Sequence, residues 1–207
     1  MIPKIIHHVW IGPLPRPVRL METWRAMNPS FQYELWNNAR VHSFDFRNAK
    51  QIGEMRSWAG KVDLMRYEIL ERHGGIFIDA DSECVRPLDD ELLQHDSFAC
   101  YEQEMIRAGL ISNGNLGAIQ GCRLMRLLMH EAAMKSMHSG PAWRLVGPKL
   151  LTETVAKYAY TDLHVYPSHY FLPKHYSGVE YHGDGPVYAK QYWGTTRDAY
   201  NEILRTA

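Results

Sequence analysis

Two aspartates two positions apart, Asp79 and Asp81, are the residues of this sequence best suited to chemistry. They follow the apolar run Ile76–Ile78, whose β-branched and aromatic residues predict a buried strand. Because alternate residues of an extended chain face the same side, both carboxylates can address one ligand. Neighbouring carboxylates repel each other unless a cation lies beside them, so the spacing predicts a hard divalent metal ion. Taken alone, the pattern also suits a solvated acidic turn after a strand.

A helix that carries charged residues precedes this strand. Residues Lys61–His73 have the apolar spacing of a helix, and the glycine pair that follows predicts its C-terminal cap. Asp63, Arg66 and Tyr67 lie at positions i, i+3 and i+4, so they share one side of this helix. An arginine there is suited to a phosphate and an aspartate to sugar hydroxyls. An ordinary surface ion pair is the alternative.

The start of the chain predicts an α/β fold. The apolar runs Ile2–Ile11 and Phe31–Trp36 predict strands, and Val18–Met27 between them has helical spacing. This order of elements is typical of a mostly parallel sheet flanked by helices. Such sheets bind ligands at the carboxyl ends of their strands, where Gly12 and Asp81 fall.

The rest of the chain continues this alternation without an internal repeat or linker, so we expect one domain over residues 1–207. Residues 167–196 are dense in Tyr, His, Gly and Pro, which predicts an ordered, aromatic-rich loop region at the active site. The other elements that the sequence predicts are short helices in 39–60, an edge strand at Ser97–Tyr101, a loop leading into a strand at Ile111–Ile119, helices at Cys122–Met137 and Gly147–Tyr160, a strand at Leu163–Tyr166 and a last helix at Arg197–Arg205.

Composition narrows the classes of function. The 207 residues include 23 basic and 23 acidic side chains, a balance that gives no bulk attraction to nucleic acid or anionic membrane. Three widely spaced cysteines form neither a zinc pattern nor a disulfide framework, which favours a reducing compartment. No run approaches the roughly 18 apolar residues of a membrane span, and the N-terminus lacks a signal-peptide pattern, so we expect a cytoplasmic protein.

Several stretches, in the order in which they occur, resemble the family 32 glycosyltransferases, the Asp-x-Asp sugar transferases. This family includes yeast-type mannosyltransferases and bacterial capsule and lipopolysaccharide sugar transferases, and its core is similar to that of clostridial glucosylating toxins. The matching stretches are Ile2–His7, Trp10–Gly12, Trp24, Asn28-Pro29, Tyr33–Trp36, Asp63–Tyr67, Leu70 and Gly74–Asp81, with less specific matches at Asn113, Gly117-Ala118, Gly147-Pro148 and Leu151-Thr152.

The resemblance implies a GT-A fold, a Rossmann-like single domain that binds a nucleotide-sugar donor and a divalent metal ion, Mn²⁺ or Mg²⁺. It implies that the metal bridges the diphosphate and stabilises the leaving nucleotide as a Lewis acid. Carried over by position, the residues that bind the donor are Trp10, Ile11, Gly12, Asp63, Arg66, Tyr67, Asp79 and Asn113.

The resemblance also assigns roles to these residues. The stretch Trp10–Gly12 is expected to hold the nucleotide base, and Asp63 and Arg66 the donor sugar and phosphate. Asp79 is expected to contact the ribose or sugar, and Asp81 to be the direct metal ligand with Asp79 beside it. Asp79, Asp81 and Arg66 are therefore the predicted catalytic residues.

One departure from the family lies near the C-terminus. Relatives carry a His-rich segment before a Trp there, and this segment helps to close over the metal and diphosphate. Here the corresponding run, Tyr188–Thr195, has no histidine, so no third protein ligand of the metal is evident. Lys190 is suited to neutralise phosphate and Trp193 to stack on the donor, while His182 and Asp184 lie close enough in sequence to substitute. A merely structural aromatic loop is the alternative.

The function expected from the resemblance is metal-dependent transfer of a hexose from a nucleotide sugar, UDP-linked rather than GDP-linked, to a hydroxyl acceptor. Relatives retain the anomeric configuration, and no second carboxylate is an obvious nucleophile, which favours front-face attack. The acceptor stays open between a glycan, a protein and a modified nucleic acid such as a hydroxylated phage DNA base. A non-catalytic nucleotide-sugar binding module and a nucleotide-sugar hydrolase are the alternative functions.

Overall fold

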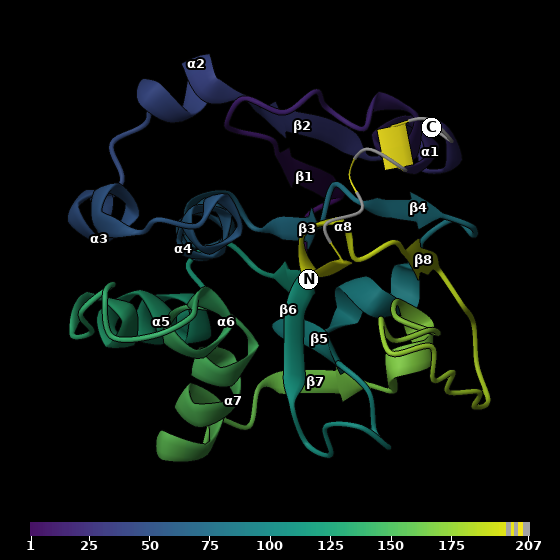
Figure 1. Cartoon of the computed structure of the whole chain (residues 1–207). Coiled ribbons are helices and arrows are strands. Elements are labelled where there is room, and N and C mark those ends of the chain that lie inside the picture. Colours follow the sequence, from purple (N-terminus) through teal and green to yellow (C-terminus); the bar gives the residue numbers. More distant parts are fainter. Residues whose placement is uncertain (198–199, 201–202, 205–207) are drawn as a thin grey trace.

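The computed structural model describes residues 1–197, 200, 203 and 204. A six-stranded sheet in the order β2-β1-β3-β6-β5-β7 forms its centre (Figure 1). Every strand except β6 runs in the same direction, because β6 is antiparallel to both of its neighbours while the other pairs are parallel. This confirms the predicted mixed α/β fold with a mostly parallel sheet. The strands are β1 (Ile5–Val9), β2 (Gln32–Trp36), β3 (Gly75–Ile78), β5 (Ser97–Tyr101), β6 (Ile111–Ala118) and β7 (Leu163–Tyr166).

The opening strand, helix and strand are confirmed. Helix α1 spans Val18–Met27, as predicted, and β1 pairs in parallel with both β2 and β3. Strand β1 is shorter than the predicted Ile2–Ile11. Its first residues leave the sheet because Pro3 has no N–H for a ladder and the Ile2 N–H donates to the Leu93 carbonyl, 2.8 Å away.

Two apolar layers cover the two faces of the sheet, as the alternation along β3 shows. Phe77 packs into the core that contains α4 (Trp58–His73), α5 (Arg123–Ala133) and α7 (Pro148–Lys157). Ile76 and Ile78 pack into the opposite core, with Trp24 of α1 and side chains from the 166–189 region. The carboxyl end of β3 therefore lies between two rigid layers.

The remaining helices are α2 (Asn38–His42), α3 (Ala49–Glu54), η1 (Asp90–Gln94), α6 (Ala142–Leu145), η2 (Ser168–Tyr170) and α8 (Gly194–Arg197).

Strands β5 and β6 correct two predictions. Residues 111–118 form a strand over their whole length, and all of them are buried, whereas the sequence predicts a loop before a strand. The small residues permit close packing, since a Cβ on Gly117 would lie 2.1 Å from the Phe98 ring. Strand β5 lies between β6 and β7, so β7 and not β5 is the edge strand.

The C-terminal region returns to the two aspartates, where it forms a separate two-stranded sheet. Strand β8 (Ala189–Gln191) pairs antiparallel with β4 (Ser82–Cys84), which directly follows them in the chain. The 167–196 region is ordered by aromatic packing, with Phe171 stacked on Tyr188 at 5.4 Å. The predicted helix Arg197–Arg205 lies partly outside the described residues. None of the helices in the described part of the chain is long and apolar enough to span a membrane.

Candidate active site

Asp79 and Asp81 follow β3 directly, where the chain leaves the sheet. The Asp79 N–H donates to the Gly114 carbonyl of β6 at 3.0 Å, and the Ser82 hydroxyl donates to the Asp79 carbonyl at 2.8 Å. These bonds hold the short turn between β3 and β4. The Asp79 side chain is 31% exposed, whereas residue Asp81 is only 7% exposed.

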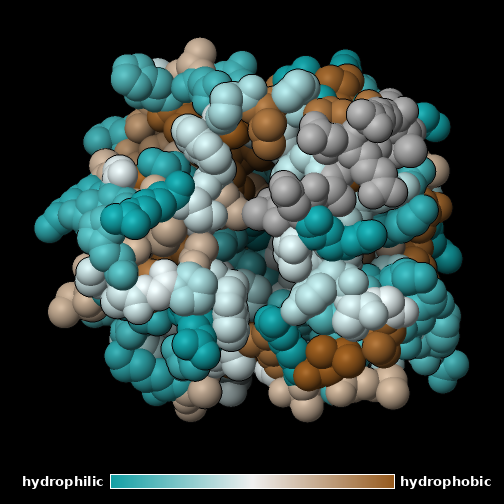
Figure 2. Space-filling model, viewed as in Figure 1, coloured by the Kyte–Doolittle hydropathy of each residue, from teal (hydrophilic) through white to brown (hydrophobic). Residues whose placement is uncertain are grey.

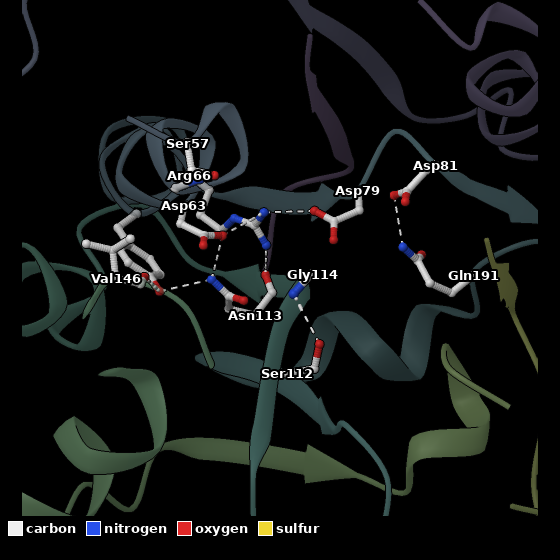
Figure 3. A network of polar contacts seen from close by, with 12 residues as sticks. Ser57, Asp63, Arg66, Asp79, Asp81, Ser112, Asn113, Gly114, Val146 and Gln191 are labelled. Atoms are coloured by element: carbon white, nitrogen blue, oxygen red, sulfur yellow. Dashed lines mark hydrogen bonds and ion pairs between the residues drawn. The ribbon is translucent and has the colours of Figure 1, made fainter. Parts of the chain in front are cut away.

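Arg66 of α4 joins three parts of the chain at this point (Figure 3). Its Nη2 lies 2.8 Å from Asp79 Oδ1 and 3.1 Å from Asp63 Oδ1, and its Nη1 donates to the Asn113 carbonyl. The guanidinium also packs over the Phe77 ring, 4.5 Å from its centroid, and its side chain is 3% exposed. The structure thus brings together the predicted Asp63, Arg66 and Asp79, and the surface-pair alternative does not apply to a buried arginine.

Asn113 and Tyr67 form the next layer. The Asn113 amide donates to Asp63 Oδ1 at 2.9 Å and to the Tyr67 hydroxyl at 3.1 Å. That hydroxyl in turn donates to the Val146 carbonyl at 2.7 Å. Tyr67 is fully buried and does not line the cleft, so its position corrects the predicted donor contact. Its place behind Asn113 makes it a positioning residue.

Burial and charge set the pKa values at this site. Burial raises the pKa of Asp63 to about 6, because desolvation outweighs the attraction of Arg66 and the nearby Asp79 adds to the rise. Burial and the charge of Asp79 likewise raise the pKa of Asp81 to about 6. Burial opposes the charge of Arg66, yet Asp79 and Asp63 raise its pKa above the usual value. The site therefore holds more negative charge than one arginine compensates.

The C-terminal region holds Asp81 in place. The Gln191 amide donates to Asp81 Oδ1 at 2.9 Å and the Gly194 N–H donates to Oδ2 at 2.6 Å. The Tyr192 N–H donates to the Asp81 carbonyl at 3.0 Å. Gln191 is absent from the predicted site because only the pairing of β8 with β4 brings it there.

The structure corrects the roles predicted for Lys190, His182 and Asp184. Alternate residues of a strand face opposite sides, so Gln191 faces the cleft while Lys190 is exposed and covers the Tyr192 ring. The His182 side chain is 81% exposed beside Glu180. Neither His182 nor Asp184 lines the cleft.

A cleft of about 400 Å³ lies over the carboxyl ends of these strands, and the space-filling view shows this face hollowed near its centre (Figure 2). The predicted residues that line it are Trp10, Ile11, Asp63, Arg66, Asp79, Asp81, Asn113 and Trp193. It is also lined by residues that the sequence does not single out, among them Trp58, Glu102, Arg107, Trp143 and Tyr176.

Gly12 lies beside the cleft and is not among its lining residues. Its φ of +100° and the Trp58 ring both require a glycine, because a Cβ would lie 2.9 Å from Trp58 Cδ2. Its N–H donates to Asn38 Oδ1 at 3.1 Å. The predicted base-binding role of Gly12 is thus indirect, since it lets Trp58 lie against the chain beside Trp10 and Ile11.

Trp193 lines the cleft in a left-handed backbone conformation, with φ at +57°. Its indole N–H donates to the Lys174 carbonyl at 2.9 Å, and its ring meets Tyr176 edge to face at 5.5 Å. These contacts fix the ring at the wall of the cleft, where a donor can contact it.

Gly114 allows Asp79 to approach β6, and we expect Gly114→Ala to disrupt the site. A Cβ at this position would lie 2.5 Å from Asp79 Oδ2, so the carboxylate must shift. A displacement of about 1 Å at a reacting centre can lower turnover by about 10²-fold. The measurement is sugar-nucleotide turnover. The control is Gly53→Ala on α3, where a Cβ meets no atom within 4 Å. Unchanged turnover in Gly114→Ala would contradict the close contact.

The comparison with known families identifies part of the chain. Residues 15–99 match the model of the glycosyltransferase sugar-binding region containing a DXD motif, the segment that includes Arg66, Asp79 and Asp81. An uncharacterized glycosyltransferase of Acanthamoeba polyphaga mimivirus is 27% identical, over 76% of this chain and 66% of that protein. Inositol phosphoceramide mannosyltransferase 3 of Schizosaccharomyces pombe is 31% identical, over 42% of this chain and 26% of that protein. The chain therefore spans less than two thirds of the length of these two relatives.

Solved structures share the fold at low sequence identity. The PaToxG glycosyltransferase has a TM-score of 0.59 and 16% identity, over 76% of this chain and 70% of that one. The UDP-bound glycosyltransferase domain of the YGT toxin has a TM-score of 0.56 and 10% identity, over 79% of each chain. A glycosyltransferase involved in glycosylation of the major capsid of PBCV-1 has a TM-score of 0.53 and 12% identity, over 96% of this chain and 100% of that one. Residues 15–99 thus match the sugar-binding region of DXD glycosyltransferases, and the chain shares the GT-A fold of these solved structures, with Asp63, Arg66, Asp79 and Asp81 brought together at one cleft.

Proposed function

We propose that the protein transfers a hexose from a nucleotide sugar, UDP-linked in preference to GDP-linked, to a hydroxyl group of an acceptor in a metal-dependent reaction. The observation that carries this proposal is the convergence of Arg66 with Asp63 and Asp79 within 3.1 Å, next to Asp81, in one cleft. This arrangement offers both a cation for phosphate and carboxylates for a metal ion and sugar hydroxyls.

The donor set at Asp79 and Asp81 fits a hard divalent cation, Mn²⁺ or Mg²⁺. Burial and the charge of Asp79 raise the pKa of Asp81, and a bound cation would offset the repulsion between the two carboxylates. Each Asp81 oxygen accepts one hydrogen bond and keeps a second lone pair for a metal. Within the described part of the chain, no three His, Cys, Asp or Glu side chains cluster as a metal site. A divalent ion held here would take its protein ligands from Asp79 and Asp81.

The roles of the residues follow from their positions. Trp10, Ile11 and Trp58 form the apolar wall suited to the nucleotide base, and Arg66 holds Asp79 toward the cleft. When bound, the metal ion supplies a Lewis acid that stabilises the negative charge developing on the departing diphosphate. Asp81, buried and held by Gln191 and Gly194, presents its carboxylate in a fixed orientation, which avoids reorganisation during the reaction.

The proposed stereochemical course is retention by front-face attack. The bond from the anomeric carbon to the phosphate oxygen breaks, the acceptor oxygen forms its bond on the same face, and the leaving phosphate takes the acceptor's proton. Glu102 is a carboxylate in the cleft, but its pairing with Arg107 at 3.2 Å does not favour a nucleophile. Proton NMR of the fresh product tests this course, and an inverted linkage would overturn it.

The names of the relatives guide the choice of donor. One solved relative of the same fold is UDP-bound, which favours a UDP sugar here. Proteins named inositol phosphoceramide mannosyltransferases keep mannose as a candidate hexose, and the acceptor class stays open between glycan, protein and modified nucleic acid.

We expect the purified protein to release UDP from a UDP sugar only when Mn²⁺ or Mg²⁺ is present. The assay incubates it with a panel of UDP and GDP sugars, with and without acceptors, and measures the free nucleotide. Chelation with EDTA should reduce release to background, and added Mn²⁺ should restore it, because the diphosphate loses its neutralising ion. A donor that binds without turnover would indicate a binding module instead, and turnover that no acceptor changes would indicate a hydrolase.

A further inference from the structure

A second group of side chains lies in the same cleft, away from the two aspartates. Glu102 follows β5, Arg107 lies in the connection between β5 and β6, Trp143 belongs to α6 and Tyr176 to the segment after η2. We call these four residues the acceptor wall. None of them belongs to a recognisable motif, and the donor chemistry described above uses none of them.

Arg107 ties the acceptor wall together. Its Nη1 lies 3.2 Å from Glu102 Oε1, and its Nη2 donates to the Tyr176 hydroxyl at 3.0 Å. Its guanidinium carbon packs 4.9 Å from the centroid of a Trp143 ring. One cation therefore fixes a carboxylate and two aromatic rings that come from three separate segments. Such a fixed set is typical of a preorganised binding site.

Glu102 has unused capacity to accept hydrogen bonds. The residue is 5% exposed and lines the cleft, yet among the described residues its Oε1 accepts no well-oriented hydrogen bond. The nearest side-chain nitrogens, Arg107 Nη1 and His175 Nε2, lie 3.2 and 3.6 Å away, and burial lowers the pKa of His175, which disfavours its cationic form. A buried carboxylate oxygen that accepts no hydrogen bond is costly, even with an ion-pair partner nearby. A hydroxyl group from a ligand would satisfy it.

The two aromatic rings are partly open to solvent. Trp143 is 37% exposed and Tyr176 36% exposed, although both contact Arg107 and line the cleft. Aromatic faces pack against apolar surface while polar groups beside them make hydrogen bonds. A sugar or similar ring has an apolar C–H face and hydroxyls at its edge. The acceptor wall offers a complement to both.

The register of β6 places the acceptor wall at a suitable distance from the aspartates. The Asp79 N–H donates to the Gly114 carbonyl, and the Glu102 N–H donates to the Leu110 carbonyl at 2.9 Å. Leu110 directly precedes β6 and lies four residues before Gly114, which is about 13 Å along an extended chain. A donor hexose can lie in this interval, with the acceptor beyond it.

We propose that the acceptor wall binds a sugar or another polyol ring as the acceptor, with its C–H face on Trp143 and Tyr176 and its hydroxyls on Glu102 and Arg107. This inference rests on the proposed transferase function and names its acceptor class. The cation of the wall, Arg107, is already paired with Glu102, which leaves no excess positive charge for the phosphates of nucleic acid. A wall of two fixed rings suits a ring rather than an extended peptide.

The test measures two kinds of binding to the same variants. Saturation-transfer NMR follows a panel of methyl glycosides of mannose, glucose and galactose together with myo-inositol, and calorimetry follows UDP with Mn²⁺. We expect Trp143→Ala to weaken binding of the recognised ring about tenfold, as loss of an aromatic contact would, and to leave UDP affinity within about twofold. The matched variant Trp58→Ala, beside Gly12, should weaken UDP and leave the ring unaffected.

Glu102→Gln is a second variant that keeps the volume of the side chain and tests the polar half of the site. It should weaken ring binding with UDP affinity unchanged, and circular dichroism should show a wild-type fold. Unchanged ring affinity in both Trp143→Ala and Glu102→Gln would overturn the proposal. So would a wild-type protein that binds UDP but no ring of the panel, including one that glycosylates only a peptide or DNA. If UDP fails to bind and a ring binds through Trp143, the transferase proposal fails while the ring site stands.

Discussion

Asp81→Asn is expected to abolish metal-dependent turnover while the protein stays folded. The substitution keeps the shape of the side chain but removes the charge that holds a divalent cation at the diphosphate. Loss of several kcal/mol of stabilisation at the leaving group corresponds to a decrease in turnover of about 10³-fold or more. The measurement is UDP release at saturating donor and Mn²⁺. Retained turnover would remove Asp81 from the metal site.

The same substitution should not destabilise the metal-free protein at neutral pH. The raised pKa of Asp81, about 6, means that between about pH 4 and 6 the folded state binds more protons than the unfolded state. The contribution of Asp81 to stability therefore falls as pH rises through this range. Between pH 4 and pH 7, the free energy of unfolding of wild type should therefore fall by on the order of 1 kcal/mol relative to that of Asp81→Asn. Urea unfolding of both proteins without metal measures this difference.

A matched control separates the metal site from a general effect of charge. Asp90 forms an exposed ion pair with Lys4 at 2.7 Å, and its side chain is 68% exposed. Asp90→Asn should leave turnover and stability close to wild type, since exposed pairs contribute little. A similar loss of activity in both variants would contradict a specific role for Asp81.

Arg66→Ala is expected to have the largest effect on stability. It leaves the carboxylates of Asp63 and Asp79 together without their shared cation, in a region where Asp63 is only 8% exposed. Breaking a buried pair costs about 3–5 kcal/mol, and the partial exposure of Asp79 places this case near 3 kcal/mol. Urea unfolding at pH 7 measures the loss. Donor binding should weaken with it, because the phosphate also loses its cation.

The chain supplies a control with the same spacing. Arg86 and Asp89 are also three residues apart, with nitrogen and oxygen 3.3 Å apart, but their side chains are 52% and 45% exposed. Arg86→Ala should therefore change stability by less than about 1 kcal/mol. Arg66→Lys keeps the charge but loses the planar fork that reaches the aspartates through Nη2 and the Asn113 carbonyl through Nη1, so its stability should lie between wild type and Arg66→Ala. Equal losses for Arg66→Ala and Arg86→Ala would refute the importance of burial.

The sequence predicts best those parts of the site whose residues are close in the chain. Asp63 and Arg66 lie on one helical turn, and Asp79 follows the next strand, so local geometry places them together. The glycine cap after α4 and the extent of α1 are also local, and both predictions are confirmed.

The remaining residues of the site depend on contacts between distant segments. Gln191 donates a hydrogen bond to Asp81, although the two residues are 110 positions apart in the sequence. Because neighbouring residues of β8 face opposite sides, Gln191 faces the cleft and Lys190 does not. Glu102 and Trp143 carry no motif and meet only through Arg107. Strand β6 was predicted in part as a loop because its polar residues resemble one. Their side chains are in fact used in buried hydrogen bonds such as that of Asn113 with Asp63.

Two main-chain carbonyls of β6 hold residues of the site in place, and this has a consequence for how the protein can diversify. The Gly114 carbonyl holds the Asp79 N–H and the Asn113 carbonyl holds Arg66, so both anchors are atoms that every amino acid possesses. Substitutions on the surrounding walls, such as at Trp143 or Tyr176, leave these anchors in place. Acceptor preference can therefore drift by mutation while the catalytic centre is inherited unchanged.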